Sequence, residues 1–150
     1  SHYNSMNVLS MHALIGAYKP EGHEWADELC EVLTDNIEYG YNYIKEHFEG
    51  VEVTKPEGTY MIFPDFSKWL EKHGRTIEEV YAAGVKAGVI WQPGSAFNGP
   101  NCIRMNLALP HSKLVEAMNR LKTALKGLEM DAESLDDLYN AFSENNIKIE

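Results

Sequence analysis

Residues 93–110 read PGSAFNGPNCIRMNLALP, and the second half of this stretch has the pattern of a strand buried on one side. Ile103, Met105 and Leu107 recur with a period of two, which places them on one face of a sheet. Arg104 lies between them and is one of only three arginines in a chain with a formal net charge of −10. We expect the apolar set to face helices and Arg104 to face the other way.

Amphipathic and apolar segments precede and follow this strand in the sequence. Thr76 and Glu79 have the spacing of a capping box, which predicts a helix start. Pro64 cannot donate to a β-ladder, so we expect its strand to end there or to lie at an edge of the sheet. The whole order predicts an α+β fold with a small, mainly antiparallel sheet backed by helices. Helices are expected at 4–18, 23–48, 66–72 and 76–87 and from 110 onward, with a break at 19–22; strands are expected at 51–53, 59–63, 89–91 and 101–109.

The composition suits a single soluble domain of 150 residues, with 44% hydrophobic and 24% charged residues. The acidic balance argues against nucleic acid as a partner. No run approaches the ~18 apolar residues of a membrane span, and the N-terminus lacks a secretory pattern. We therefore expect a cytoplasmic protein without membrane contact. Because the chain does not begin with Met, we also expect it to be a processed or cut segment.

Two further features bear on the organisation of the chain. Cys30 and Cys102 lie far apart without a CxxC motif, and we expect two buried, reduced thiols. The segment 129–150 carries seven acids and a single lysine, so it is expected to be a solvated acidic extension with a short helix. We place the main domain at 1–128.

Motifs for autonomous chemistry are incomplete. Gly94 and Gly99 have the glycine spacing of a phosphate loop, but Pro100 and Asn101 stand where Lys and Ser/Thr are needed. The six histidines lack metal-ligand spacing, and there is no Gly-x-Ser-x-Gly elbow. The chain alone is not expected to be an enzyme or to bind a metal.

Arg104 is the remaining chemical feature. A guanidinium on the open face of a sheet presents a fixed fork of donors that matches a carboxylate. The alternatives are a structural ion pair with one of the many acids and an exposed strand charge.

Three stretches of this sequence carry a family resemblance. PGSAFNGPNCIRMNLALPHSKLVEAMNRL, GAYKPEGHEWADELCEVLTDN and EGTYMIFPDFS resemble motifs of fold type I pyridoxal-phosphate enzymes, the aspartate-aminotransferase fold. Within this family they look most like the aminotransferase-related cystathionine β-lyases. The resemblance covers residues 5–127 and implies the C-terminal small domain of such an enzyme.

By this resemblance, Arg104 corresponds to the arginine that binds the α-carboxylate of an amino-acid substrate. Gly58, Tyr60 and Asn98 would lie near the same cleft. The full-length enzyme would use pyridoxal 5'-phosphate held by a lysine in a Ser/Thr-x-x-Lys setting, for which the chain offers only Lys126, on the exposed part of a helix. We therefore expect the large cofactor-binding domain to be missing, no cofactor to be bound here, and the fragment to be inactive alone.

Some points stay open at this stage. The family implies a homodimer for the full-length enzyme, and the sequence does not separate an aminotransferase from a C–S β-lyase. Gln92 departs from the family pattern, which has an apolar residue there. A different class of function is a free-standing binding module with an acidic interaction tail.

Overall fold

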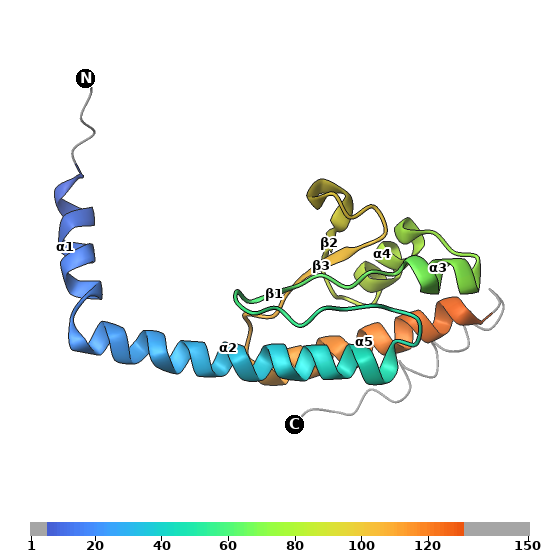
Figure 1. Ribbon diagram of the computed structural model, residues 1–150, viewed down its shortest axis with the longest axis horizontal. Coiled ribbons are helices and arrows are strands. Elements are labelled where there is room, and N and C mark those ends of the chain that lie inside the picture. The colour runs from blue at the N-terminus through green and yellow to red at the C-terminus, as the bar shows by residue number, and fades with distance from the viewer. Residues whose placement is uncertain (1–5, 131–150) are drawn as a thin grey trace, which may run out of the picture. The chain divides into compact units, whose positions relative to one another are not determined.

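The computed structural model describes residues 6–130, and the chain divides into two units, Ser1–Asp35 and Asn36–Glu150. The predicted helix at the acidic C-terminus lies outside the described residues. None of the helices within residues 6–130 combines the length and the apolar character of a membrane span. Figure 1 shows the elements in order: α1 (Val8–Ala17), α2 (Pro20–His47), β1 (Met61–Ile62), α3 (Ser67–His73), α4 (Ile77–Lys86), β2 (Gln92–Pro93), a 3₁₀ helix (Gly94–Phe97), β3 (Ile103–Asn106) and α5 (His111–Glu129).

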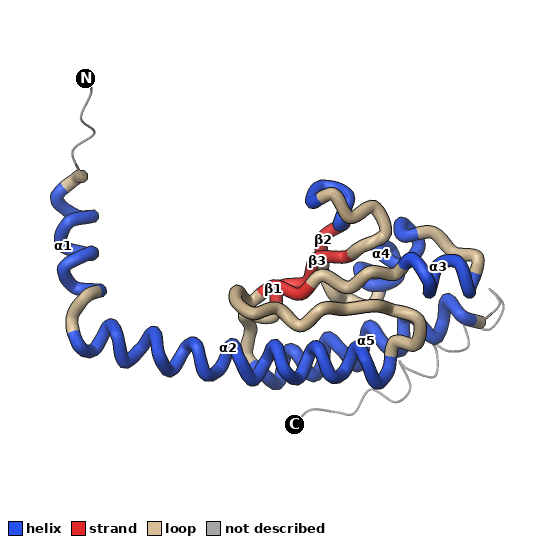
Figure 2. Tube along the Cα trace, viewed as in Figure 1, coloured by secondary structure: helices blue, strands red, loops and turns tan. Residues whose placement is uncertain are grey.

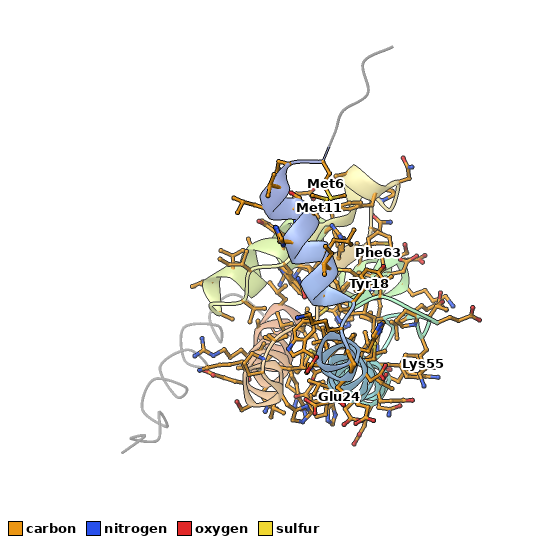
Figure 3. The ribbon with its side chains drawn as sticks, turned by 90° about the vertical axis from the view of Figure 1, so that its left-hand side faces the viewer. Met6, Met11, Tyr18, Glu24, Lys55 and Phe63 are labelled. Atoms are coloured by element: carbon orange, nitrogen blue, oxygen red, sulfur yellow. The ribbon has the colours of Figure 1, made fainter. Side chains whose placement is uncertain are left out.

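The first unit is helical. Asn7 caps α1, and its side chain accepts a hydrogen bond from the backbone N–H of Ser10 at 2.8 Å. The apolar residues of α1 are exposed, and Figure 3 shows Met6 and Met11 along this segment. The expected break at 19–22 is shorter than predicted, because α2 begins at Pro20. The fixed φ of proline suits the first position of a helix, so Pro20 starts α2 and does not interrupt it.

The sheet has three short antiparallel strands in the order β1–β3–β2, as Figure 2 shows in red. Met61 pairs with Asn106, and Gln92 pairs with Arg104. The predicted α+β class and antiparallel sheet are confirmed. As expected from Pro64, β1 ends before this proline and lies at an edge of the sheet.

The prediction of a strand at 89–91 is wrong, because these residues do not pair with another strand. Trp91 is buried but is held by its side chain: the indole N–H donates to the carbonyl oxygen of Tyr81 at 3.1 Å. Ile90 is 88% exposed, and pairing begins only at Gln92. The strand expected at 51–53 reduces to one bridge, between Glu52 and Asp65.

One face of the sheet carries the core of the second unit. Helix α5 and the C-terminal part of α2 run side by side along it (Figure 1), and the hydroxyl of Tyr43 on α2 donates to Asn119 Oδ1 on α5 at 2.7 Å. Each fully buried large apolar side chain stabilises the fold by about 1.5–3 kcal/mol. The prediction that Ile103, Met105 and Leu107 face helices is confirmed, since all three lie in this core. They lie there together with side chains of α5, namely Leu114, Met118 and Leu121.

Local signals set the ends of α4. Thr76 accepts a hydrogen bond from the N–H of Glu79, and the Glu79 carboxylate accepts one from the N–H of Thr76, so the predicted capping box is confirmed. The helix is followed by Gly88, whose φ of +80° lies in the region that glycine tolerates.

The two cysteines differ, so the prediction of two buried thiols is wrong for Cys30, which is exposed. Cys102 is buried although it lies two residues before Arg104 and so shares its face of an extended chain. The chain after β2 folds back over it: the N–H of Gly94 donates to the carbonyl oxygen of Cys102 at 2.7 Å. Burial raises the pKa of the Cys102 thiol.

Candidate functional site

Arg104 lies at the centre of a row of side chains that crosses the open face of the sheet. It is directly opposite Gln92 in the β2–β3 pair. The β1–β3 register continues past β1, since the N–H of Ile103 donates to the carbonyl oxygen of Pro64 at 3.1 Å. This register places Phe63 opposite Arg104 on the other side. Directly opposite residues share a face of a sheet, so Phe63, Arg104 and Gln92 form one row.

The described contacts of Arg104 are with neutral groups. Its Nη1 donates to Gln92 Oε1 at 2.9 Å. Its Cζ atom lies 4.5 Å from the centroid of the Phe97 ring, which is within cation–π range. The side chain of Arg104 is half-buried in this setting.

The other two arginines of the chain have carboxylate partners. Arg75 Nη1 lies 3.3 Å from Glu79 Oε1, and Arg120 Nη2 lies 2.6 Å from Glu116 Oε1. No ion pair of Arg104 is found within the part of the chain that the structure describes. Because an amide oxygen and an aromatic ring carry no net charge, none of these described partners neutralises the guanidinium.

The loop between β2 and β3 is built to present Phe97. Asn98 takes a left-handed conformation with φ of 60° and ends the 3₁₀ helix that carries Phe97. The ring of Phe97 meets that of Phe63 edge to face, with centroids 6.5 Å apart. Gly99 lies directly against Phe63: a Cβ there would be 2.7 Å from the ring. A Cβ would also lie 2.9 Å from Cβ of Cys102, so any side chain at Gly99 would force the loop or these neighbours to move.

The other predicted site residues are less closely tied to Arg104. Asn98 is the next residue after Phe97, whose ring contacts Arg104, so it lies near the row of Phe63, Arg104 and Gln92. Tyr60 is 41% exposed, and its carbonyl oxygen accepts a hydrogen bond from the N–H of Leu107 at 2.9 Å. Gly58 lies in the exposed segment before β1. Gly58, Tyr60 and Asn98 make no described hydrogen bond or ring contact with Arg104, and their part in a site stays a prediction.

Sequence reasoning missed Gln92 and Phe63 as neighbours of Arg104. The departure of Gln92 from the family pattern was a signal, but its meaning depended on a register that the sequence does not show. The loop length between residues 92 and 104 does not by itself select a pairing.

Two features of the described residues bear on a cofactor or a metal: the position of Lys126 and the arrangement of the possible metal ligands. Lys126 is exposed on α5, which packs on the covered face of the sheet and so lies on the other side from Arg104. It therefore does not fit the role of a lysine that holds pyridoxal phosphate next to this arginine. Within residues 6–130, no group of three or more His, Cys, Asp or Glu side chains could hold a metal ion.

Two curated relatives show what this chain is similar to in sequence. It is 44% identical over 77 residues to the Aquifex aeolicus protein named "Probable aspartate/prephenate aminotransferase", a match that covers 51% of this chain and 20% of the relative. It is 28% identical over 123 residues to the cystathionine β-lyase PatB of Bacillus subtilis, covering 80% of this chain and 30% of PatB. No protein-family model matches the chain.

Solved structures agree with these relatives. A PLP-bound C–S lyase from Staphylococcus hominis matches with a TM-score of 0.71 and 26% identity, over 83% of this chain and 33% of the lyase. The chain thus spans a third or less of the length of the proteins it matches.

Proposed function

We propose that this chain forms the substrate-carboxylate-binding small domain of a pyridoxal-phosphate-dependent enzyme. Its relatives and structural neighbours are aminotransferases and C–S lyases that use this cofactor, and their similarity to this chain is consistent with part of a fold type I enzyme. The observation that carries the proposal is the open guanidinium of Arg104, which has neutral partners in an acidic chain. The substrate would be an amino acid, bound through its α-carboxylate.

The chemistry of this role follows from the arrangement of donors. A guanidinium presents parallel N–H groups that bind both oxygens of a carboxylate, and such charge-assisted bonds are stronger than neutral ones. A clamp of this kind fixes the orientation of the substrate before reaction, which contributes to the rate through positioning. Pyridoxal phosphate would supply the electron sink when bound.

The cofactor and its lysine would come from outside the described residues, from a large domain joined to or associated with this chain, and the full-length enzyme would be a homodimer. We propose that the chain alone is inactive. Incubation of the purified chain with pyridoxal phosphate should give no lysine aldimine absorbance, and borohydride should trap no stoichiometric adduct at a single lysine. A stoichiometric, borohydride-trapped adduct would overturn this proposal.

The role of Arg104 is tested in an enzyme assembled from this chain and a cofactor-binding domain. The matched segment of PatB is replaced by this chain, and KM for cystathionine is measured with and without Arg104→Leu. We expect substrate capture to weaken by about 2–5 kcal/mol, seen as a raised KM, because a desolvated charge pair loses one partner. Unchanged KM and kcat would remove Arg104 from the site and favour a binding module of another kind.

A further inference from the structure

Gln92 is the only described hydrogen-bond partner of the Arg104 guanidinium. The two residues are a directly opposed cross-strand pair, and the bond joins Arg104 Nη1 to Gln92 Oε1 at 2.9 Å. We propose that Gln92 is a positioning residue, which holds the fork of Arg104 in the orientation that receives a substrate carboxylate. This inference rests on the proposed function and adds a residue to it.

Two contacts restrict different motions of the Arg104 guanidinium and together determine its orientation. Phe97 lies against the Cζ atom at 4.5 Å and limits the tilt of the guanidinium plane. A ring contact alone leaves the fork able to rotate within that plane. The bond to Gln92 removes this rotation, since it holds one particular nitrogen. Because arginine has a large rotamer entropy, holding it before binding lowers the entropy lost when substrate arrives.

The neutrality of Gln92 is as important as its position. The chain has 23 acidic residues against 13 lysines and arginines, and Arg75 and Arg120 are both paired with glutamates. A glutamate at position 92 would form a charge-assisted bond to Arg104 and neutralise the fork. An amide oxygen accepts one N–H and leaves both the charge and the remaining donors for a substrate.

The test begins with the 150-residue chain itself, in which only three arginines give Nε–H signals. The NMR order parameter of the Arg104 Nε–H should be near that of rigid backbone, about 0.85, and should fall below about 0.6 in Gln92→Met. Methionine has a similar shape but no amide acceptor, so loss of order reports the hydrogen bond and not packing. Ile90→Thr, at a neighbouring exposed position, is the control and should leave the order parameter unchanged.

The same variants are then placed in the PatB chimaera. Loss of one hydrogen bond in Gln92→Met should raise KM about threefold to tenfold with kcat nearly unchanged. Gln92→Glu should raise KM more, by about tenfold or above, because its carboxylate competes with that of the substrate. On an Arg104→Leu background both effects should vanish, since a positioning residue acts only through its partner.

The outcomes separate this inference from the proposed function. If Arg104→Leu leaves KM unchanged, the carboxylate-binding function itself fails. If Arg104→Leu raises KM while Gln92→Met changes neither the order of Arg104 nor KM, the positioning role of Gln92 is overturned and the function stands. Should the chimaera not fold, an unchanged order parameter in Gln92→Met overturns the inference by itself.

Discussion

The buried side chain of Asn36 donates a hydrogen bond to the carbonyl oxygen of Leu107 over 2.9 Å. Its second amide hydrogen goes to the carbonyl oxygen of Leu109 at 2.9 Å, and its Oδ1 lies 3.0 Å from Nδ1 of His111. Since both amide hydrogens are donated, Oδ1 must accept, and His111 carries a proton on Nδ1. One side chain on α2 thus connects the end of β3 to the start of α5.

Asn36→Leu should therefore destabilise the fold strongly. The change removes the hydrogen bonds of Asn36 with Leu107, Leu109 and His111 and puts an apolar side chain in their place, although the carbonyl oxygen of Leu107 keeps the N–H of Leu109 as a partner at 3.0 Å. We expect a loss of about 2–4 kcal/mol in the free energy of unfolding. Urea unfolding followed by circular dichroism measures it. Asn42→Leu, at an exposed position of the same helix, is the matched control and should change stability by less than about 0.5 kcal/mol. Equal effects of the two variants would contradict this account.

Gly84→Ala should also be destabilising, through crowding. A Cβ at Gly84 would overlap the indole of Trp91, whose Nε1 atom would be 2.5 Å away. Trp91 is buried and cannot move aside, so the cost is about 1–3 kcal/mol. Gly58→Ala is the control, because nothing lies within 4 Å of a Cβ there. Thermal unfolding monitored by tryptophan fluorescence compares the two, and a stable Gly84→Ala would show that this contact is loose.

The capping box of α4 should make part of the stability depend on pH. The backbone N–H of Thr76, which donates to Glu79, holds the pKa of that carboxyl below its ordinary value of 4.5. The charged form therefore stabilises the folded chain above about pH 4.5, and this contribution is lost as the pH falls through the lower pKa of the folded state.

Glu79→Gln isolates this contribution, because glutamine keeps an acceptor for the Thr76 N–H but has no charge. The variant should be less stable than the parent at pH 6, and the difference should shrink toward pH 3. Unfolding free energies measured across this range are the test. A difference that is constant with pH would mean that the charge of Glu79 plays no part.

Arg104→Leu should leave the isolated chain folded, since within residues 6–130 the guanidinium of Arg104 makes one hydrogen bond, to Gln92, and one ring contact, with Phe97. Its expected effect on the unfolding free energy is at most about 1 kcal/mol, the size of one surface hydrogen bond. Chemical denaturation of the 150-residue chain gives the value. A loss comparable to that of Asn36→Leu would assign Arg104 to the structure and weaken its assignment to a site.

The two thiols should react at very different rates. Cys30 is exposed, whereas Cys102 is buried. Burial raises the pKa of the Cys102 thiol, so a smaller fraction of it is the thiolate that reacts with an alkylating reagent. Iodoacetamide at neutral pH should label one thiol in the folded chain and two after unfolding, as counted by mass spectrometry. Cys30→Ser should leave no rapidly labelled thiol. Fast labelling of that variant would show that the loop over Cys102 opens readily.

Local sequence signals determined the helices and one strand of this protein. The Thr76–Glu79 box predicted the start of α4 because a capping box needs only residues within one turn. The period of two at Ile103, Met105 and Leu107 predicted the strand and its covered face, because alternation is a property of an extended backbone. The family resemblance could also point to Arg104 from the sequence alone, because the motif that contains this arginine is one continuous run of residues.

Only the tertiary structure decided where pairing begins and what surrounds Arg104. Val89–Trp91 has strand composition, yet Trp91 is held against Gly84 and Ile90 points to solvent. Pairing starts instead at Gln92, opposite Arg104. A cross-strand register depends on which backbone groups meet in three dimensions, so the amide that holds the guanidinium became visible only when residues twelve positions apart were placed side by side.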